Sequence, residues 1–267
     1  MKTRMKNLAG RLLIAVLLVG AGALAVRSHR AMQGPELQPW HTFVPVELRA
    51  DELDAADWPR FLSQEQAVFD SVQANVTQRL EPEARVPYNR YFEGSPVYAP
   101  GFARDWNRSF VIEPASEPSG AVVLLHGLTD SPYSLRHVAQ RYAERGFVAI
   151  GIRMPGHGTV PGGLTDVRWE DWAAAARLAL REARRRVPAP APLHIVGFSN
   201  GGALALKHSL DAIEDPQLPR ADRLVLLTPM IGITRFARFA GLAGLPALLP
   251  PFAKAAWLGN LPEFNPF

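Results

Sequence analysis

Short apolar runs that alternate with longer helical stretches are the feature that most constrains the fold. The runs are 121–125 (AVVLL), 147–152 (FVAIGI), 193–197 (LHIVG) and 224–227 (LVLL). A strand buried on both faces of a parallel sheet has a continuous apolar sequence of this kind. The helices expected between the runs cover 132–145, 168–187 and 201–213. Strand–helix alternation predicts right-handed crossovers, so the fold class is α/β, with a mostly parallel sheet and helices on both faces.

The residues before the first run have a different pattern. Residues 31–60 are rich in Pro, Trp and acidic residues and are expected to form a linker. Ser63 and Gln66 have the spacing of a capping box, and the apolar residues that follow predict an amphipathic helix over 64–80. A strand is expected at 109–112. These patterns divide the chain into a leader (1–30), a linker with an N-terminal helix (31–85), an α/β core (86–229) and a last apolar segment (230–267).

The basic residues are unevenly distributed along the chain. Of the 29 Lys and Arg residues, six lie within residues 1–30, which contain none of the 25 Asp and Glu residues. The rest of the chain therefore has slightly more acidic than basic residues, although the whole chain has a formal net charge of +4. A nucleic-acid-binding surface needs clustered Lys and Arg, so this distribution argues against a nucleic acid partner.

Residues 1–30 have the composition of an export signal. Residues 12–26 are uncharged and follow a basic stretch. The apolar core of a signal peptide has about 7–15 residues and precedes small residues at the cleavage site, a pattern that Ala23-Leu24-Ala25 fits. The alternative is an uncleaved anchor that tethers the protein to the membrane through 12–26, although such an anchor needs about 20 apolar residues. In both cases we expect the body on the extracytoplasmic side of a bacterial-type inner membrane, because positive charge stays in the cytoplasm.

A Gly-x-Ser-x-Gly sequence lies directly between a predicted strand and a predicted helix. It consists of Gly197, Phe198, Ser199, Asn200 and Gly201. In a nucleophile elbow, a serine occupies a tight strand-to-helix turn, and glycines flank it because side chains there would collide with the strand and the helix. The turn exposes the hydroxyl next to the positive end of a helix dipole. Ser199 is therefore the candidate nucleophile, and the alternative is a Gly-rich turn with a helix-capping serine.

A second motif, His126-Gly127-Leu128, follows the run 121–125. Acyl transfer through a serine needs two backbone N–H donors directed at the developing oxyanion. One donor comes from the residue after the nucleophile, here Asn200, and the other from the loop after an earlier strand, here Leu128. Gly127 permits the tight turn that presents this donor. His126 is expected to hold the loop by hydrogen bonds rather than to transfer protons.

Together these motifs resemble those of the α/β-hydrolase family, in particular its bacterial esterases, lysophospholipases and monoacylglycerol-lipase-like members. The matching residues are 126–136 (HGLTDSPYSLR), 153–162 (RMPGHGTVPG) and 197–206 (GFSNGGALAL). The resemblance implies a serine hydrolase of carboxylic esters that acts on lipid-like or other apolar acyl substrates through Ser199. It also implies that His157, in the Pro-Gly-His-Gly sequence, is structural.

Two members of this family's catalytic triad are not found in the sequence. In the family, the acid and then the histidine follow the nucleophile. Beyond Asp222 the one acidic residue is Glu263, and no histidine follows His208. The resemblance therefore implies that 230–267 is part of a lid or cap, and that the C-terminal strands, the catalytic acid and the catalytic histidine are missing. On that basis we expect an impaired enzyme.

No cofactor or metal ion is expected. The chain has no cysteine, and its seven histidines include no pair at metal-ligand spacing beside acidic residues. Two alternatives stay open: cleavage of amides by the same residues, and a non-catalytic, membrane-tethered binding or scaffolding protein on a hydrolase fold. The missing acid and base favour the scaffold, whereas the intact elbow and oxyanion loop favour an enzyme.

Overall fold

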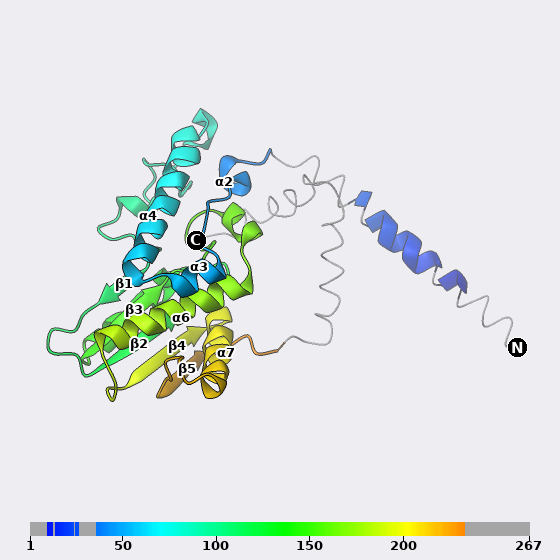
Figure 1. Cartoon of the computed structure of the whole chain (residues 1–267). Helices are drawn as coiled ribbons and strands as arrows, with labels where there is room; N and C mark the ends of the chain where they lie inside the picture. Colours follow the sequence, from blue (N-terminus) through cyan, green and yellow to red (C-terminus); the bar gives the residue numbers. More distant parts are fainter. Residues whose placement is uncertain (1–9, 13, 24, 27–35, 233–267) are drawn as a thin grey trace, which may run out of the picture. The chain divides into compact units, whose positions relative to one another are not determined.

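The computed structural model describes residues 10–12, 14–23, 25–26 and 36–232 (Figure 1). The chain forms two compact units, one of which is Pro39–Thr234 and contains the sheet. The other unit combines Met1–Gln38 with Arg235–Phe267, and its described residues between 10 and 26 are helical. Among the residues that the structure describes, none of the helices combines the length and the apolar character needed to cross a membrane. Apart from residues 230–232, the predicted cap segment lies outside the described residues.

A five-stranded sheet forms the centre of the unit Pro39–Thr234. Its strands are β1 (Phe110–Ile112), β2 (Gly120–Leu125), β3 (Phe147–Ile152), β4 (Leu193–Phe198) and β5 (Arg223–Leu227). The order across the sheet is β1-β3-β2-β4-β5. The strands β3, β2, β4 and β5 are parallel, and β1 pairs with β3 in the antiparallel direction. This arrangement confirms the predicted α/β fold with a mostly parallel sheet.

Helices cover both faces of the sheet, as the strand sequences require. Alternate residues of a strand point to opposite faces, and in β2 every residue is buried. Val123 packs in one core with α6 (Trp169–Arg186) and α7 (Asn200–Glu214). Val122 packs in a second core with α5 (Arg136–Ala143) on the opposite face. The continuous apolar runs of the sequence therefore reflect burial on two sides.

The helix predicted over 64–80 is α4, which spans Trp58–Asn75. It begins earlier because the Asp57 side chain caps it by accepting a hydrogen bond from the backbone N–H of Arg60 (2.9 Å). Ser63 lies within the helix, so the predicted capping box there is wrong. The helix starts about one turn earlier than the local capping pattern predicts because this start buries aromatic side chains. Trp58, for example, is 5% exposed.

Residues 39–56 are folded, in contrast to the linker expected over 31–60. They include α2 (Pro39–Thr42) and α3 (Ala50–Ala55). The side chain of Leu53 in α3 is fully buried in the same core as α6. We call residues 39–80, which comprise α2, α3 and α4, the N-terminal arm. The arm is part of the core, which the sequence pattern did not show because its first part, within 31–60, is rich in proline and acidic residues.

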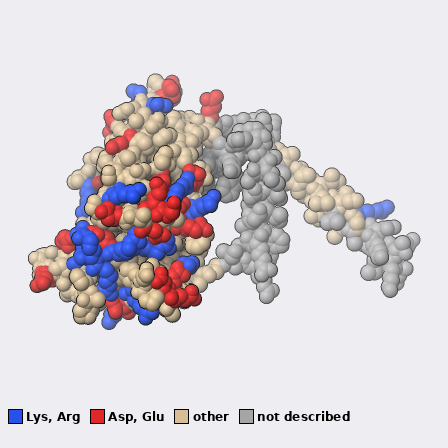
Figure 2. All heavy atoms as spheres, in the orientation of Figure 1, with Lys and Arg blue, Asp and Glu red and all other residues tan. Residues whose placement is uncertain are grey.

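Basic and acidic side chains lie side by side over the face that presents α3 and α6 (Figure 2). Arg177 of α6 pairs with Asp54 of α3 (2.6 Å), and Arg185 of α6 pairs with Glu182 (2.7 Å). The Arg177–Asp54 pair is partly exposed, and exposed pairs contribute about 0–1 kcal/mol each, so it neutralises the surface more than it stabilises the fold.

Candidate active site

Ser199 lies on the turn between β4 and α7, where the chain leaves the carboxyl edge of the sheet. Its backbone has φ 51° and ψ −113°, a conformation that side-chain-bearing residues rarely adopt. Backbone hydrogen bonds hold it there: its N–H donates to Leu227 (2.9 Å), and its carbonyl accepts from Met230 (3.0 Å) and Gly202 (3.0 Å). Strain of this kind costs about 1–3 kcal/mol and persists where the surrounding structure fixes it. The backbone of Ser199 is thus held in a defined position at the ends of β4 and β5.

The two glycines of the motif are needed because the backbone approaches other backbone closely. A Cβ atom at Gly201 would collide with the carbonyl oxygen of Leu125, at the end of β2. A Cβ atom at Gly197 would lie 2.5 Å from the carbonyl oxygen of Gly201. Both approaches are far closer than van der Waals contact, so a side chain at Gly201 would push the elbow away from β2 and one at Gly197 would push β4 away from the first turn of α7. The glycines therefore keep Ser199 next to the loop that follows β2.

That loop places a second set of groups beside the serine. The parallel register sets Leu125 of β2 opposite Gly197 of β4, so both strands end at the same edge. A Cβ atom at Gly127 would be 3.5 Å from the Cβ atom of Ser199. The Gly127 N–H donates to the Asp130 carboxylate (3.4 Å), which holds the turn.

Two backbone N–H groups next to the contact between Gly127 and Ser199 are candidate donors. They belong to Leu128, in the loop after β2, and Asn200, the first residue of α7. Within the described part of the chain, neither N–H donates to an acceptor. The N–H of Asn200 also lies at the positive end of the helix dipole, which favours negative charge. The structure therefore places Ser199 beside Asn200 and the loop that contains Leu128, and their roles as nucleophile and oxyanion donors stay predictions.

His126 is fully buried, and both of its ring nitrogens make hydrogen bonds. Nε2 accepts from the backbone N–H of Met154 (3.0 Å), and Nδ1 lies 2.9 Å from the carbonyl oxygen of Gly127. Since a backbone N–H can only donate, Nε2 is unprotonated and Nδ1–H donates to Gly127. Burial lowers the pKa of His126 to about 4, with a smaller contribution from the charge of Arg153. A neutral ring with both nitrogens occupied holds the loop and is not free to accept a proton from Ser199.

His157 lies beside His126, with ring centroids 5.0 Å apart, and its ring also contacts Trp172 at 5.3 Å. Its Nδ1 bonds to the carbonyl oxygen of Pro155 (3.0 Å). Burial, with a further contribution from His126, lowers the pKa of His157 to about 3. Its Nε2 is buried and has no hydrogen-bond partner among the described residues. His157 thus packs in the wall of the site as a neutral ring.

The other described histidines are placed away from the serine. They are His41, which accepts from Trp40; His137, on the exposed side of α5; His194, at the start of β4; and His208, which bonds to Pro219. His208 is nine residues along α7 from Ser199, about 13 Å at the rise of an α-helix. In the part that the structure describes, the Ser199 hydroxyl has no hydrogen-bond partner. Among the described residues, no histidine is therefore hydrogen-bonded to Ser199.

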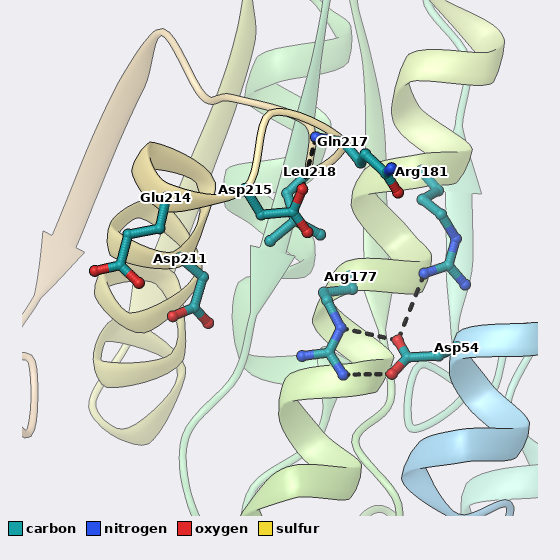
Figure 3. Close-up of a pocket in the computed structure, with 8 residues that line it drawn as sticks. All are labelled: Asp54, Arg177, Arg181, Asp211, Glu214, Asp215, Gln217 and Leu218. Carbon is teal, nitrogen blue, oxygen red and sulfur yellow. Dashed lines mark hydrogen bonds and ion pairs between the residues drawn. The ribbon is translucent and has the colours of Figure 1, made fainter.

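A surface pocket lies elsewhere, between α3, α6 and the end of α7 (Figure 3). Its two arginines are paired, since Arg177 donates to Asp54 at 2.8 and 2.6 Å and Arg181 lies 3.7 Å from the same carboxylate. The pocket is lined by the carboxyl end of α7, whereas Ser199 precedes its amino end. A helix of this length spans about 22 Å, so the pocket is separate from the serine. No group of three or more acidic or histidine side chains in the described residues could hold a metal ion.

A family model described as serine aminopeptidase, S33, matches residues 116–261, more than half of the chain. The chain belongs to this family of α/β hydrolases. The matched region contains the loop after β2, the Pro-Gly-His-Gly loop and the Gly-x-Ser-x-Gly turn.

The chain is also similar to individual lipases and esterases. A thermostable monoacylglycerol lipase from Bacillus sp. (strain H-257) is 32% identical over 85 residues, which cover 32% of this chain and 33% of the lipase. A solved structure from a pair of metagenome-derived lipolytic enzymes is 26% identical with a TM-score of 0.43, over 53% of this chain and 51% of that one. A carboxyl esterase from Bacillus coagulans is 19% identical with a TM-score of 0.41, over 53% and 44% of the two chains. The chain thus spans about a third of the length of the curated lipase that it matches.

Proposed function

We propose that the chain is a serine hydrolase of carboxylic esters in which Ser199 is the nucleophile. The observation that supports this most directly is the elbow: Ser199 is held at φ 51°, and the N–H groups of the adjacent Asn200 and of Leu128 have no acceptor in the described part of the chain. The Ser199 oxygen attacks the ester carbonyl carbon, and the carbonyl oxygen becomes negative. The N–H groups of Leu128 and Asn200 stabilise that charge. The alcohol then leaves with a proton, and water hydrolyses the acyl-serine.

The side chains around the elbow favour an apolar acyl group. Four apolar side chains near Ser199 in the chain or in the fold are exposed: Leu128 (44%), Phe198 (36%), Met230 (45%) and Ile231 (61%). An apolar rim beside a polar reacting centre is the usual composition of a small-molecule site. The similarity to a monoacylglycerol lipase is in line with a lipid-like ester.

The described residues include no identified general base for the proton-transfer step. No described histidine nitrogen is bonded to Ser199, and the sequence has no histidine beyond His208. With the nucleophile and oxyanion donors alone, we expect turnover to be lower by about 10⁴- to 10⁶-fold than with a complete triad. The chain by itself is therefore proposed to be an impaired esterase.

Two other functions have one observation each in their favour. The description of the family model as a serine aminopeptidase favours cleavage of amide bonds by the same residues. The Ser199 hydroxyl without a partner in the described part favours a non-catalytic binding or scaffolding role. The scaffold does not explain why the elbow keeps its strained geometry and both close-approach glycines, so we favour the enzyme.

The location of the protein is a separate proposal. The basic residues before position 12 and the uncharged stretch 12–26 support export, by a cleaved signal or with an N-terminal tether to the membrane. Expression in a bacterium, fractionation, and determination of the N-terminal residue of the extracytoplasmic protein would test it. Recovery of the unprocessed chain in the cytoplasm would contradict it.

Acylation of Ser199 tests the enzymatic proposal without a need for rapid turnover. The purified chain is incubated with p-nitrophenyl butyrate, with and without added imidazole as an external base, and digested peptides are weighed by mass spectrometry. We expect a butyryl group on the peptide that contains Ser199, formed faster with imidazole and absent from Ser199→Ala. A folded chain that acquires no acyl group at Ser199 in imidazole would exclude this nucleophile, whereas acylation would exclude the scaffold.

A further inference from the structure

Three charged side chains are buried together where the N-terminal arm meets the sheet. Arg153, at the end of β3, is 1% exposed, and its guanidinium binds the Glu47 carboxylate through two hydrogen bonds of 2.7 and 3.0 Å. Its Nε also donates to Glu65 of α4 (3.1 Å). Glu47 and Glu65 come from the arm and are 9% and 3% exposed. The arm thus supplies both carboxylates that neutralise one buried cation.

The carboxylates of Glu47 and Glu65 also accept hydrogen bonds from backbone N–H and hydroxyl groups. Glu47 accepts from the backbone N–H of Gly156 (2.8 Å), and Glu65 accepts from the hydroxyl of Ser109 (2.7 Å). Burial alone would raise the pKa of Glu47, but the charge and hydrogen bonds of Arg153 outweigh it and hold that pKa below its ordinary value. Removing one partner of a buried, satisfied pair leaves an unpaired buried charge, which is costly.

The buried cluster of Arg153, Glu47 and Glu65 fixes a segment that also contacts the oxyanion loop. Residues 153–157 are held on one side by Glu47, through the Arg153 guanidinium and the Gly156 N–H. On the other side the same segment presents the Met154 N–H to Nε2 of His126 (3.0 Å). Nδ1 of His126 in turn bonds to the carbonyl oxygen of Gly127, one residue before the Leu128 donor. A continuous series of hydrogen bonds therefore connects the arm to the residue that precedes one of the two proposed oxyanion donors.

We infer that Glu47, with Arg153, is a positioning residue for the oxyanion loop, so that the N-terminal arm is part of the catalytic apparatus and not an accessory to it. This rests on the proposed function, because it assigns the loop its role in ester cleavage. If the contact between Glu47 and the 153–157 segment is lost, Met154 moves, His126 loses its acceptor role, and the Leu128 N–H is no longer directed at the carbonyl. Misplacement of a catalytic group by about 1 Å costs up to about 100-fold in rate.

A second ion pair between the arm and the core provides a matched control. Asp54 of α3 accepts two hydrogen bonds from Arg177 of α6, at 2.8 and 2.6 Å, just as Glu47 does from Arg153. Its partner belongs to α6 and not to the 153–157 segment. The Asp54→Asn variant removes the same charge from the same arm, and we expect it to change the rate of Ser199 acylation by less than about 2-fold.

The test compares Glu47→Gln with Asp54→Asn in two measurements at a temperature where both are folded. The first is the rate of Ser199 acylation by p-nitrophenyl butyrate in imidazole, which we expect to fall about 10- to 100-fold in Glu47→Gln. The second is the ¹⁵N spectrum of the imidazole rings, which reports whether Nδ1 of His126 carries the proton. We expect that signal to be unchanged in Asp54→Asn and shifted in Glu47→Gln, an effect that lower stability alone would not produce.

The outcomes separate the two proposals. Absence of acylation in the unaltered chain would contradict the proposed function, while the His126 spectrum would still decide the positioning role. An unshifted His126 signal, or an unchanged acylation rate, in Glu47→Gln would overturn the inference. If Glu47→Gln does not fold, Glu47→Asp keeps the charge and withdraws the carboxylate by one methylene. We expect a slower but measurable acylation and a shifted His126 signal, and unaltered values would overturn the inference equally.

Discussion

At the scale of single residues, the wall of the site is built from histidines that their surroundings keep neutral. His126 and His157 are buried in contact with each other, and a charge on either ring would lie near the guanidinium of Arg153. Neutral rings can accept and donate at the same time, which is how His126 joins Met154 to Gly127. The same neutrality makes folding sensitive to acid.

We expect the free energy of unfolding to fall as the pH is lowered from 6.5 to about 4. The unfolded chain binds a proton at His126 below its ordinary pKa of 6.5, whereas the folded chain does so only near its lowered pKa of about 4. The loss for His126 approaches about 3 kcal/mol at the acid end of this range. His157 acts in the same direction. Because Glu47 has a pKa lowered from 4.5, its contribution is present above that pH and is lost below it.

Urea unfolding at several pH values would measure this dependence. The His126→Gln variant, which offers an amide in place of the ring, is expected to lose the His126 share of the pH dependence and retain that of His157. The same substitution at His137, on the exposed side of α5, is the control and should leave the dependence as it is. Equal pH dependence in the unaltered chain and in His126→Gln would contradict the argument.

At the scale of elements, the N-terminal arm shows where local patterns fail. The sequence of 31–60 suggested a linker, and a capping box at Ser63 suggested a later helix start. The helix begins at Trp58 instead, because Trp58 and Phe61 pack against each other (ring centroids 5.6 Å apart) and enter the core of α6. Burial of two aromatic side chains is worth several kcal/mol, more than a cap of about 1 kcal/mol.

Truncation of Phe61 tests whether the arm is part of the folding unit. Phe61 is 3% exposed, so we expect Phe61→Ala to lower the free energy of unfolding by about 3–5 kcal/mol. Phe102, which is 57% exposed, is the matched control, and Phe102→Ala should change it by less than about 0.5 kcal/mol. Chemical denaturation followed by circular dichroism gives both values. A small effect at Phe61 would mean that the arm docks loosely on the sheet.

At the scale of the whole molecule, the sheet order leaves β5 at an edge of the described fold. Three of its apolar side chains are partly exposed: Leu224 (36%), Val225 (37%) and Leu227 (38%). An edge strand presents unpaired N–H and C=O groups, and an apolar edge promotes pairing with another chain. The same edge supplies Leu227, which accepts the Ser199 N–H, so disorder there would reach the elbow.

A lysine on β5 should reduce self-association of the purified chain. We expect Val225→Lys to lower the aggregated fraction by light scattering, because a charged side chain on an edge strand opposes strand addition. Leu210→Lys, on the exposed side of α7, removes an apolar group and adds the same charge away from the edge. If the two variants have equal effects, exposed apolar surface and not the strand edge drives association.

Features that depend on neighbouring residues could be predicted from the sequence, whereas contacts between residues distant in the sequence could not. The runs 121–125, 147–152, 193–197 and 224–227 all became strands within a residue or two, because burial on both faces is recorded locally in each run. The Gly-x-Ser-x-Gly turn was equally local. Nothing in the sequence indicated that Glu47 and Arg153 would meet, since they are 106 residues apart and a single charged residue has no periodic pattern.

By itself, the sequence determined the strands of the sheet, the helices that alternate with them, and the serine that lies on the strained turn, since adjacent residues fix backbone conformation. The tertiary structure alone decided the strand order and the docking of the N-terminal arm. It also decided that the ring of His126 is neutral and hydrogen-bonded through both nitrogens. Its partner Met154 is 28 residues away, and Glu47 is 109 residues from the Gly156 N–H that it accepts. Such contacts form only when the whole chain excludes water from them, because burial is what lowers the pKa of the histidines and makes each unpaired charge costly.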